Sequence, residues 1–249
     1  MKKALLVIAF LLVSGTAALA QTAIQTPDLG TLIPQGGGSA AARIIQIIAL
    51  LTVLSIAPGL LIMVTSFTRL IVALSFLRSG LGLQNTPANL ILISLALFMT
   101  FYVMAPTFDQ AWQDGMKPLM DNTISEKDAF PKIVEPFRQF MLRQVRDKDL
   151  KLFEDLAPEQ LKPKEEKNEV ELRILIPAFM ISELRRGFEM GFLIALPFLV
   201  IDMIVSTLTM SMGMMMLPPS VIALPIKILF FVLIDGWNLL IGSLVRSFS

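Results

Sequence analysis

The 249-residue sequence contains no cysteine and no histidine, and these two absences exclude several kinds of chemistry. Without cysteine the chain has no disulfide, no thiol nucleophile and no thiolate metal ligand. Without histidine it lacks the usual general base of an enzyme and the commonest zinc ligand. The net charge is only +1, so the whole chain has no electrostatic attraction for nucleic acid. We therefore expect no enzyme, no cofactor, no metal site and no nucleic-acid partner.

Apolar residues are abundant instead. They make up 55% of the chain, and the mean hydropathy of +0.71 is well above that of a soluble domain. Of the 20 acidic residues, 15 lie between Asp109 and Glu171, so the charge is concentrated in one central segment. The order apolar, polar, apolar predicts an all-α, membrane-associated fold. It consists of two long helical hairpins with broken helices and a polar helical insert between them.

The first residues have the pattern of a secretory signal peptide. Lys2 and Lys3 precede a short apolar run, and small residues precede Gln21. The run is shorter than the ~20 residues needed to span a bilayer. We predict a signal peptide over residues 1–20 and a periplasmic leader over 21–43, with an uncleaved membrane helix as the alternative.

Residues 44–106 predict the first apolar hairpin, because they contain two uncharged runs long enough to be membrane helices. The connection between the runs, residues 65–87, carries Arg69 and Arg78 and no acid. The positive-inside rule places such a short loop on the cytoplasmic side. Thr86-Pro87 is a typical start signal for the second helix.

Residues 107–172 then form a polar insert on the periplasmic side. Within it, apolar residues recur at helical spacing over residues 137–156, which predicts one amphipathic helix. Phe140 and Phe153 widen its apolar surface. A single helix cannot bury that surface alone, so it packs either within the chain or between copies of the chain.

Residues 173–249 predict the second apolar hairpin, which begins with the charged cluster of Glu183, Arg185 and Arg186. Such charges beside an apolar segment are costly unless they are paired. The cluster has two interpretations: anchoring at a membrane edge, or a ring of ion pairs between subunits.

Lys227 and Asp235 are further charges in this apolar region. Lys227 could reach a lipid head group, or it could pair with Asp235, with Asp202 or with an acid on a partner. Eight residues separate Lys227 from Asp235, so they share a helix face without direct contact. That spacing favours external partners for both.

Five methionines occur within residues 210–216, and this run has three interpretations. It could be ordinary core. It could be a soft-metal site, since thioethers favour Cu(I), but no histidine or cysteine accompanies it. It could also be a compliant seal, because methionine fills irregular gaps and repacks easily.

Several motifs resemble those of a known family: Pro177 to Phe188, the methionine-rich segment with Pro218-Pro219, and Leu224 to Lys227 followed by Asp235-Gly236-Trp237. With Ser66 to Arg69 and Gln84 to Pro87, the chain resembles the FliP family over nearly its whole length. The family comprises membrane export-gate proteins of the bacterial flagellar type III secretion system, and its close relatives serve in injectisomes.

The resemblance implies a pore-forming subunit that passes unfolded flagellar proteins across the inner membrane, within the flagellar basal body. It implies a homo-oligomer, as a pentamer, in a cone-like helical gate with FliQ, FliR and other export-gate subunits. Much of that cone would lie on the periplasmic side of the lipid. It further implies a methionine gasket at Met214, Met215 and Met216, with subunit contacts at Glu183, Phe140 and Phe153.

Rival functions use the same residues differently. A proton- or ion-coupled transporter would use Glu189, Asp202 and Asp235 as relay carboxylates. A copper carrier would use the methionine run. An intramembrane enzyme lacks a visible nucleophile–base pair, and the chain carries no glycine-rich nucleotide-binding loop.

Overall fold

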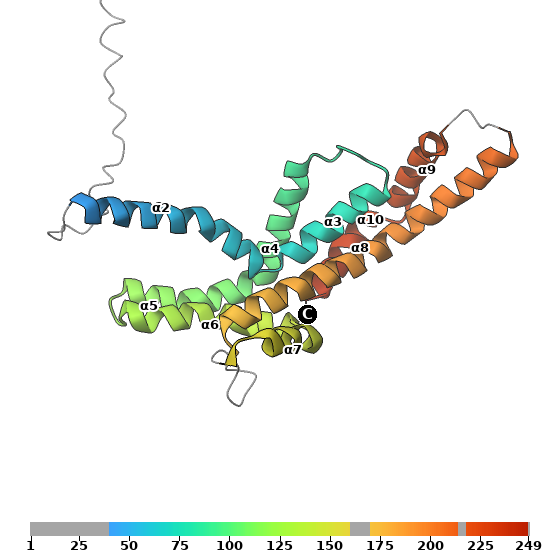
Figure 1. The fold of residues 1–249 in the computed structure, drawn as a ribbon. Helices are drawn as coiled ribbons and strands as arrows, with labels where there is room; N and C mark the ends of the chain where they lie inside the picture. Colours follow the sequence, from blue (N-terminus) through green and yellow to red (C-terminus); the bar gives the residue numbers. More distant parts are fainter. Residues whose placement is uncertain (1–39, 160–169, 214–217, 249) are drawn as a thin grey trace, which may run out of the picture. The chain divides into compact units, whose positions relative to one another are not determined.

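The computed structural model describes residues 40–159, 170–213 and 218–248. Within these residues the chain forms helices and no strand, which confirms the all-α fold (Figure 1). The predicted signal peptide and most of the predicted leader lie outside the described residues. The helices are α2 (Ala40–Met63), α3 (Phe67–Gly80), α4 (Asn89–Ala111), the π-helix η2 (Trp112–Met116), α5 (Lys117–Met120), α6 (Glu126–Gln144), α7 (Asp147–Leu156), α8 (Leu172–Ser211), α9 (Pro219–Leu233) and α10 (Gly236–Arg246).

The chain divides into two units, residues 1–52 and 53–249, and helices α3 to α10 all belong to the second. By length and composition, three described helical segments could cross a membrane: Ile44–Met63, Asn89–Met120 and Leu172–Ser211. The pair α9 and α10 forms a fourth candidate, bent by 67° at its break. Asp235 causes the break, because it adopts a left-handed conformation with φ of 51°. The broken helices expected from the sequence are therefore present.

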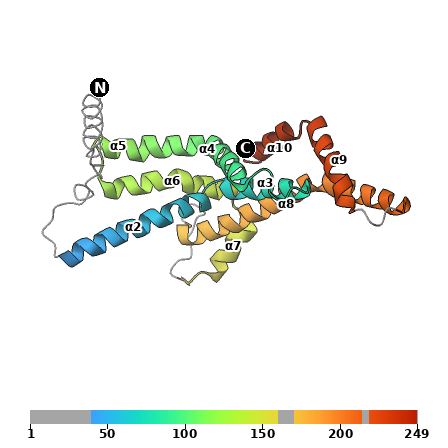
Figure 2. The same cartoon turned by 90° about the horizontal axis from the view of Figure 1, so that it is seen from above.

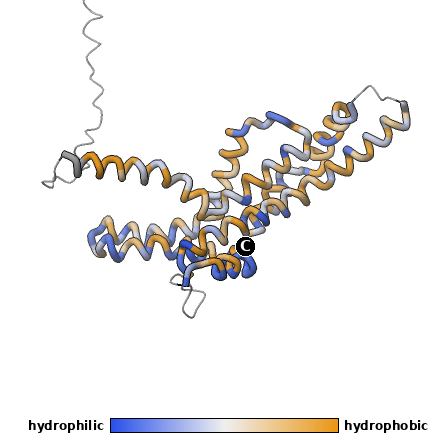
Figure 3. The backbone as a smooth tube through the Cα atoms, viewed as in Figure 1, coloured by the Kyte–Doolittle hydropathy of each residue, from blue (hydrophilic) through white to orange (hydrophobic). Residues whose placement is uncertain are grey.

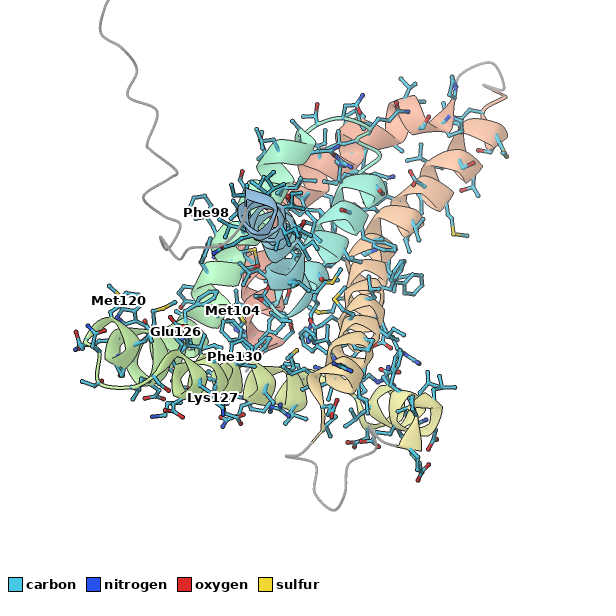
Figure 4. All side chains as sticks on the ribbon, turned by 60° about the vertical axis from the view of Figure 1, so that its left-hand side comes forward. Phe98, Met104, Met120, Glu126, Lys127 and Phe130 are labelled. Atoms are coloured by element: carbon cyan, nitrogen blue, oxygen red, sulfur yellow. The ribbon has the colours of Figure 1, made fainter. Side chains whose placement is uncertain are left out.

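The polar insert begins as a helical hairpin. α4 continues through η2 and α5, and α6 returns alongside them (Figures 1 and 2). Ser125 caps α6, since its hydroxyl oxygen accepts a hydrogen bond from the Asp128 N–H at 3.3 Å. Figure 4 shows Met120, Glu126, Lys127 and Phe130 on this hairpin. Hydrophilic residues gather at its outer end and on α7, whereas α8 is largely apolar (Figure 3).

α3 packs along α8, and this contact organises the first apolar core. Gly187 and Gly191 of α8 face α3. A Cβ atom at Gly191 would lie 2.6 Å from the Phe76 ring, and one at Gly187 would lie 3.0 Å from Val72. The two glycines therefore permit the close approach of these helices. The core contains Phe67, Leu70, Ala73, Leu74, Leu77, Leu81, Leu92, Ala96, Met99, Phe198, Phe231, Leu240 and Leu244.

A second apolar core joins the insert to the beginning of α8. α6 and α7 both pack on α8, and α6 also packs on α4. The buried members of this core are Met104, Phe140, Met141, Leu150, Val170, Ile174, Leu175, Ala178 and Phe179. Packing within the chain, one of the two possibilities open for Phe140 and Phe153, is therefore present.

Three local expectations were wrong. Residues 65–87 do not form a loop, because most of them form the buried helix α3. Residues 137–156 form parts of two helices, because Val145 and Arg146 are extended and end α6. α4 begins at Asn89 rather than at Thr86-Pro87, because Ala88 is extended with ψ of 149°.

Candidate functional site

Arg69 lies at the centre of a buried polar network. It occupies the first turn of α3 and has 0% exposure. Leu70, Leu74 and Leu77 follow it at helical spacing and are buried in the first core. Because these leucines fix α3 on its neighbours, they also carry Arg69 into the interior.

All five N–H groups of the guanidinium are used. Nε donates to Glu183 Oε2 at 2.9 Å, and Nη2 donates to Glu183 Oε1 and to Gln144 Oε1, the latter at 3.0 Å. Nη1 donates to the carbonyl oxygen of Ser247 at 2.8 Å and to its hydroxyl at 3.1 Å. The Phe248 ring centroid lies 3.8 Å from the Arg69 Cζ, so the guanidinium also stacks on an aromatic face.

Glu183 is the counter-charge of Arg69, and it too has 0% exposure. Their pairing is bidentate, which is the strongest geometry for a guanidinium and a carboxylate. Burial lowers the pKa of Arg69, while the hydrogen bond and the charge of Glu183 oppose that shift. The guanidinium nevertheless remains protonated, because its ordinary pKa is so high. The partner of Glu183 in the single chain is therefore an arginine of the same chain.

Gln144 connects α6 to this pair. Its Oε1 accepts from Arg69 Nη2 and from Arg186 Nη1, each at 3.0 Å. Its Nε2 donates to the carbonyl oxygen of Phe248 at 3.2 Å. The amide therefore joins α3, α6, α8 and the segment after α10.

Ser182 extends the network to α7. Its hydroxyl donates to Asp149 Oδ2 at 2.7 Å and accepts from the Arg146 N–H at 3.1 Å. The Arg146 N–H is thus bonded outside the helix, which explains why α6 ends just before it. Both Ser182 and Asp149 are buried, so α7 is held against α8 by polar as well as apolar contacts.

Lys227 forms a separate ion pair near the other end of α8. Its Nζ lies 2.5 Å from Asp202 Oδ2 and donates to the Gly80 carbonyl oxygen at 3.0 Å. Lys227 is 4% exposed, whereas the Asp202 side chain is 41% exposed. The cation also lies at the carboxyl end of α3, where the helix dipole favours positive charge. Of the partners considered from the sequence, Asp202 is the one observed.

The other predicted contact residues lie nearer the surface. Arg185 is exposed and donates to Glu189 Oε1 at 3.1 Å. Asp235 is exposed, and its Oδ2 accepts from the Asn238 side chain at 3.2 Å. Phe153 is half-buried, whereas Phe140 is buried between the Phe179 and Phe248 rings.

Met214, Met215 and Met216 lie outside the described residues. The two methionines before them, Met210 and Met212, are exposed. Gly213 follows in a left-handed conformation with φ of 73°. The backbone conformation at this position therefore favours glycine, which has no Cβ atom to clash at positive φ.

The charged residues singled out from the sequence mostly contact a single polar partner each. No group of three or more acidic residues with metal-binding geometry occurs in the ranges described above. The proposed relay carboxylates Glu189, Asp202 and Asp235 each have a partner of their own: Arg185, Lys227 and Asn238. Only the Lys227–Asp202 pair joins two helices, α9 and α8, whereas the other two contacts are local.

Sequence reasoning identified Glu183 but missed its partner. Arg69 was placed in a loop because residues 65–87 separate two uncharged runs, each long enough to be a membrane helix. The buried leucines that follow it at i+1, i+5 and i+8 could have revealed α3. Nothing in the sequence marks Gln144 and Ser247 as functional, because each is an isolated uncharged polar residue outside any motif.

The fold and the network define a class of protein: an all-α, membrane-associated chain whose buried charges link long helices. Comparison with known proteins identifies the family. The chain belongs to the FliP family, whose model matches residues 50–244.

Relatives agree with this assignment. A protein of Rhizobium meliloti (strain 1021) is 66% identical over 211 residues, which cover 85% of this chain and 86% of the relative. One of Caulobacter vibrioides is 50% identical and covers 94% of this chain and 85% of the relative. One of Bacillus subtilis (strain 168) is 50% identical and covers 82% and 91%. All three are named "Flagellar biosynthetic protein FliP".

Proposed function

We propose that this chain is a pore-forming subunit of the flagellar type III export gate, which passes unfolded flagellar proteins across the inner membrane. Membership of the FliP family is the observation that carries the proposal. The chain acts as a structural and conducting subunit rather than as an enzyme. It assembles as a homo-oligomer with FliQ and FliR and contacts membrane lipid.

The exposed apolar surface of α8 supports assembly into a larger body. In a single chain many large apolar side chains of this helix remain exposed, and few charged residues lie among them. These exposed residues include Phe188, Phe192, Leu193, Val200, Met203, Ile204 and Leu208. Complete burial of a fully exposed side chain of this type is favourable by about 1.5–3 kcal/mol. These side chains are still more than half exposed, so cover by neighbouring subunits and lipid would add a large part of that amount for each.

The domain organisation follows from the same role. Residues 1–20 are a signal peptide, 21–43 a leader, and 107–172 an insert on the periplasmic side between the two hairpins 44–106 and 173–249. The hydrophilic outer end of the insert (Figure 3) supports this arrangement, because it has the polarity of a surface in water.

Met214 to Met216 form the seal of the gate in this proposal. The exposed Met210 and Met212 support it, since they belong to the same methionine-rich run of the sequence and are available to contact other protein. Replacing all three gasket residues with alanine should leave assembly intact and let ions leak through the gate. Unchanged conductance in planar bilayers would count against a seal.

The predicted subunit-contact residues divide into those that can reach a neighbour and those engaged within their own chain. Arg185, Asp235 and Phe153 have accessible surface and can touch a neighbour directly. Glu183, Arg186, Phe140 and Lys227 support the contacts by fixing the helices of their own chain. Reversal of Glu183 would place a lysine beside buried Arg69, so it would damage the fold itself. Reversal of exposed Arg185 to glutamate is the cleaner test of oligomer assembly.

The proposal as a whole is tested by deleting the gene and measuring export of flagellin and hook protein into the medium. Loss of both, restored by the wild-type gene, is the expected result. Normal export and motility in the deletion strain would refute the export role.

A further inference from the structure

Two residues after α10, Ser247 and Phe248, form what we call the closing segment. They supply two hydrogen bonds and the aromatic face that surround the buried Arg69. Phe248 also accepts a hydrogen bond from Gln144. A buried guanidinium with unused donors is unfavourable, so these contacts complete a site that Glu183 and Gln144 leave unfinished.

The closing segment also joins the two apolar cores. The Phe248 side chain packs against the core around α3 and against the core of the insert. Its ring stacks on Phe140 of α6, with centroids 6.3 Å apart and an interplanar angle of 23°. Removing this ring therefore weakens the attachment of α6 more than that of α3, because α3 and α8 retain their own long contact.

The closing segment is more exposed than the ion pair that it covers. Arg69 and Glu183 have no exposed surface, whereas Ser247 and Phe248 are half-buried. Phe248 forms one wall of a groove between α4, α6 and α10, together with Tyr102, Phe140 and Gln144. The closing segment can therefore leave its place without first breaking the Arg69–Glu183 pair.

We propose that the closing segment is a latch that holds the polar insert shut on α3 and α8. With the latch in place, Gln144 and Phe140 are fixed and the second core is closed. With the latch removed, α6 and α7 open locally while α3 and α8 stay packed. The device belongs to the fold of the single chain and does not depend on what the assembled protein transports.

Accessibility of introduced cysteines tests this proposal, because the natural chain has none. Ala178→Cys reports on the second core and Ala73→Cys on the first, and both positions have 0% exposure. Each reporter is combined with Phe248→Ala in the full-length chain, in native membranes, and maleimide labelling rates are measured. The matched control is Phe130→Ala, which truncates an exposed phenylalanine of α6.

Phe248→Ala should raise the labelling rate at position 178 by about tenfold, since local opening becomes easier when the ring no longer stacks on Phe140 and on the Arg69 guanidinium. The rate at position 73 should stay at the control level. Phe248→Leu keeps apolar volume without stacking and should give a smaller rise, and it replaces Phe248→Ala if that chain fails to accumulate. An unchanged rate at position 178 would overturn the latch. Equal rises at both positions would overturn it too, because they indicate general destabilisation.

Discussion

Glu183→Gln is the substitution that most directly tests the buried network. The glutamine keeps the shape of the side chain but turns one acceptor into a donor that faces Arg69 donors. Arg69 would remain charged, fully buried and without its counter-charge. Breaking a buried pair by changing one partner costs about 3–5 kcal/mol.

For a chain of this length, 1 kcal/mol corresponds to roughly 2–4 °C in Tm, so the expected decrease is about 6–20 °C. The assay is thermal unfolding of the detergent-purified protein, followed by the fluorescence of Trp112 and Trp237. Arg69→Met and the double variant complete a double-mutant cycle. The double variant should lose much less than the sum of the single losses, because it leaves no unpaired charge.

Two results would refute this reasoning. A Tm of Glu183→Gln within about 1 °C of the wild type would mean that the pair contributes almost nothing. Strictly additive losses in the cycle would mean that Arg69 and Glu183 do not act together, whatever their distance.

Three further predictions concern other parts of the chain. Lys227→Met should cost about 1–3 kcal/mol by thermal unfolding, because the half-exposed Asp202 can recover water while the lost hydrogen bonds to a charged group are not replaced. Gly191→Ala should destabilise by about 1–3 kcal/mol through contact with Phe76, whereas Gly59→Ala, with open space around it, should be neutral or slightly stabilising. Asp235→Val should cost about 1–2 kcal/mol, since a β-branched residue is strained at this left-handed position, and Asp235→Gly should not.

The helical class and the approximate locations of the long apolar helices α2, α4, α8 and α9 followed from the sequence, because long uncharged runs predict helices. The break at Arg146 did not follow, because its cause is a hydrogen bond to Ser182, 36 residues away. Helical spacing continues across that break, so local periodicity favoured one helix over two. Long-range contacts of this kind leave no local pattern.

For the charged residues too, the sequence predicted local features but not long-range contacts. The sequence indicated that Glu183 and Lys227 need partners, since unpaired charges in apolar segments are costly. It could not select those partners. Arg69 lies 114 residues from Glu183, and Asp202 lies 25 residues from Lys227. The choice depends on how α3, α8 and α9 pack, which hydropathy alone does not encode.

The uninterrupted length of α8 limits where its charges can lie in a bilayer. At about 1.5 Å per residue, its 40 residues extend for about 60 Å, twice the ~30 Å hydrocarbon thickness. Glu183 and Asp202 are 19 positions apart on this helix, which corresponds to about 28 Å along its axis. The two ion pairs therefore cannot both occupy the bilayer midplane. If one lies there and α8 runs along the bilayer normal, the other lies outside the hydrocarbon, whose half-thickness is only about 15 Å. The length of α8 therefore places its two ion pairs in different surroundings.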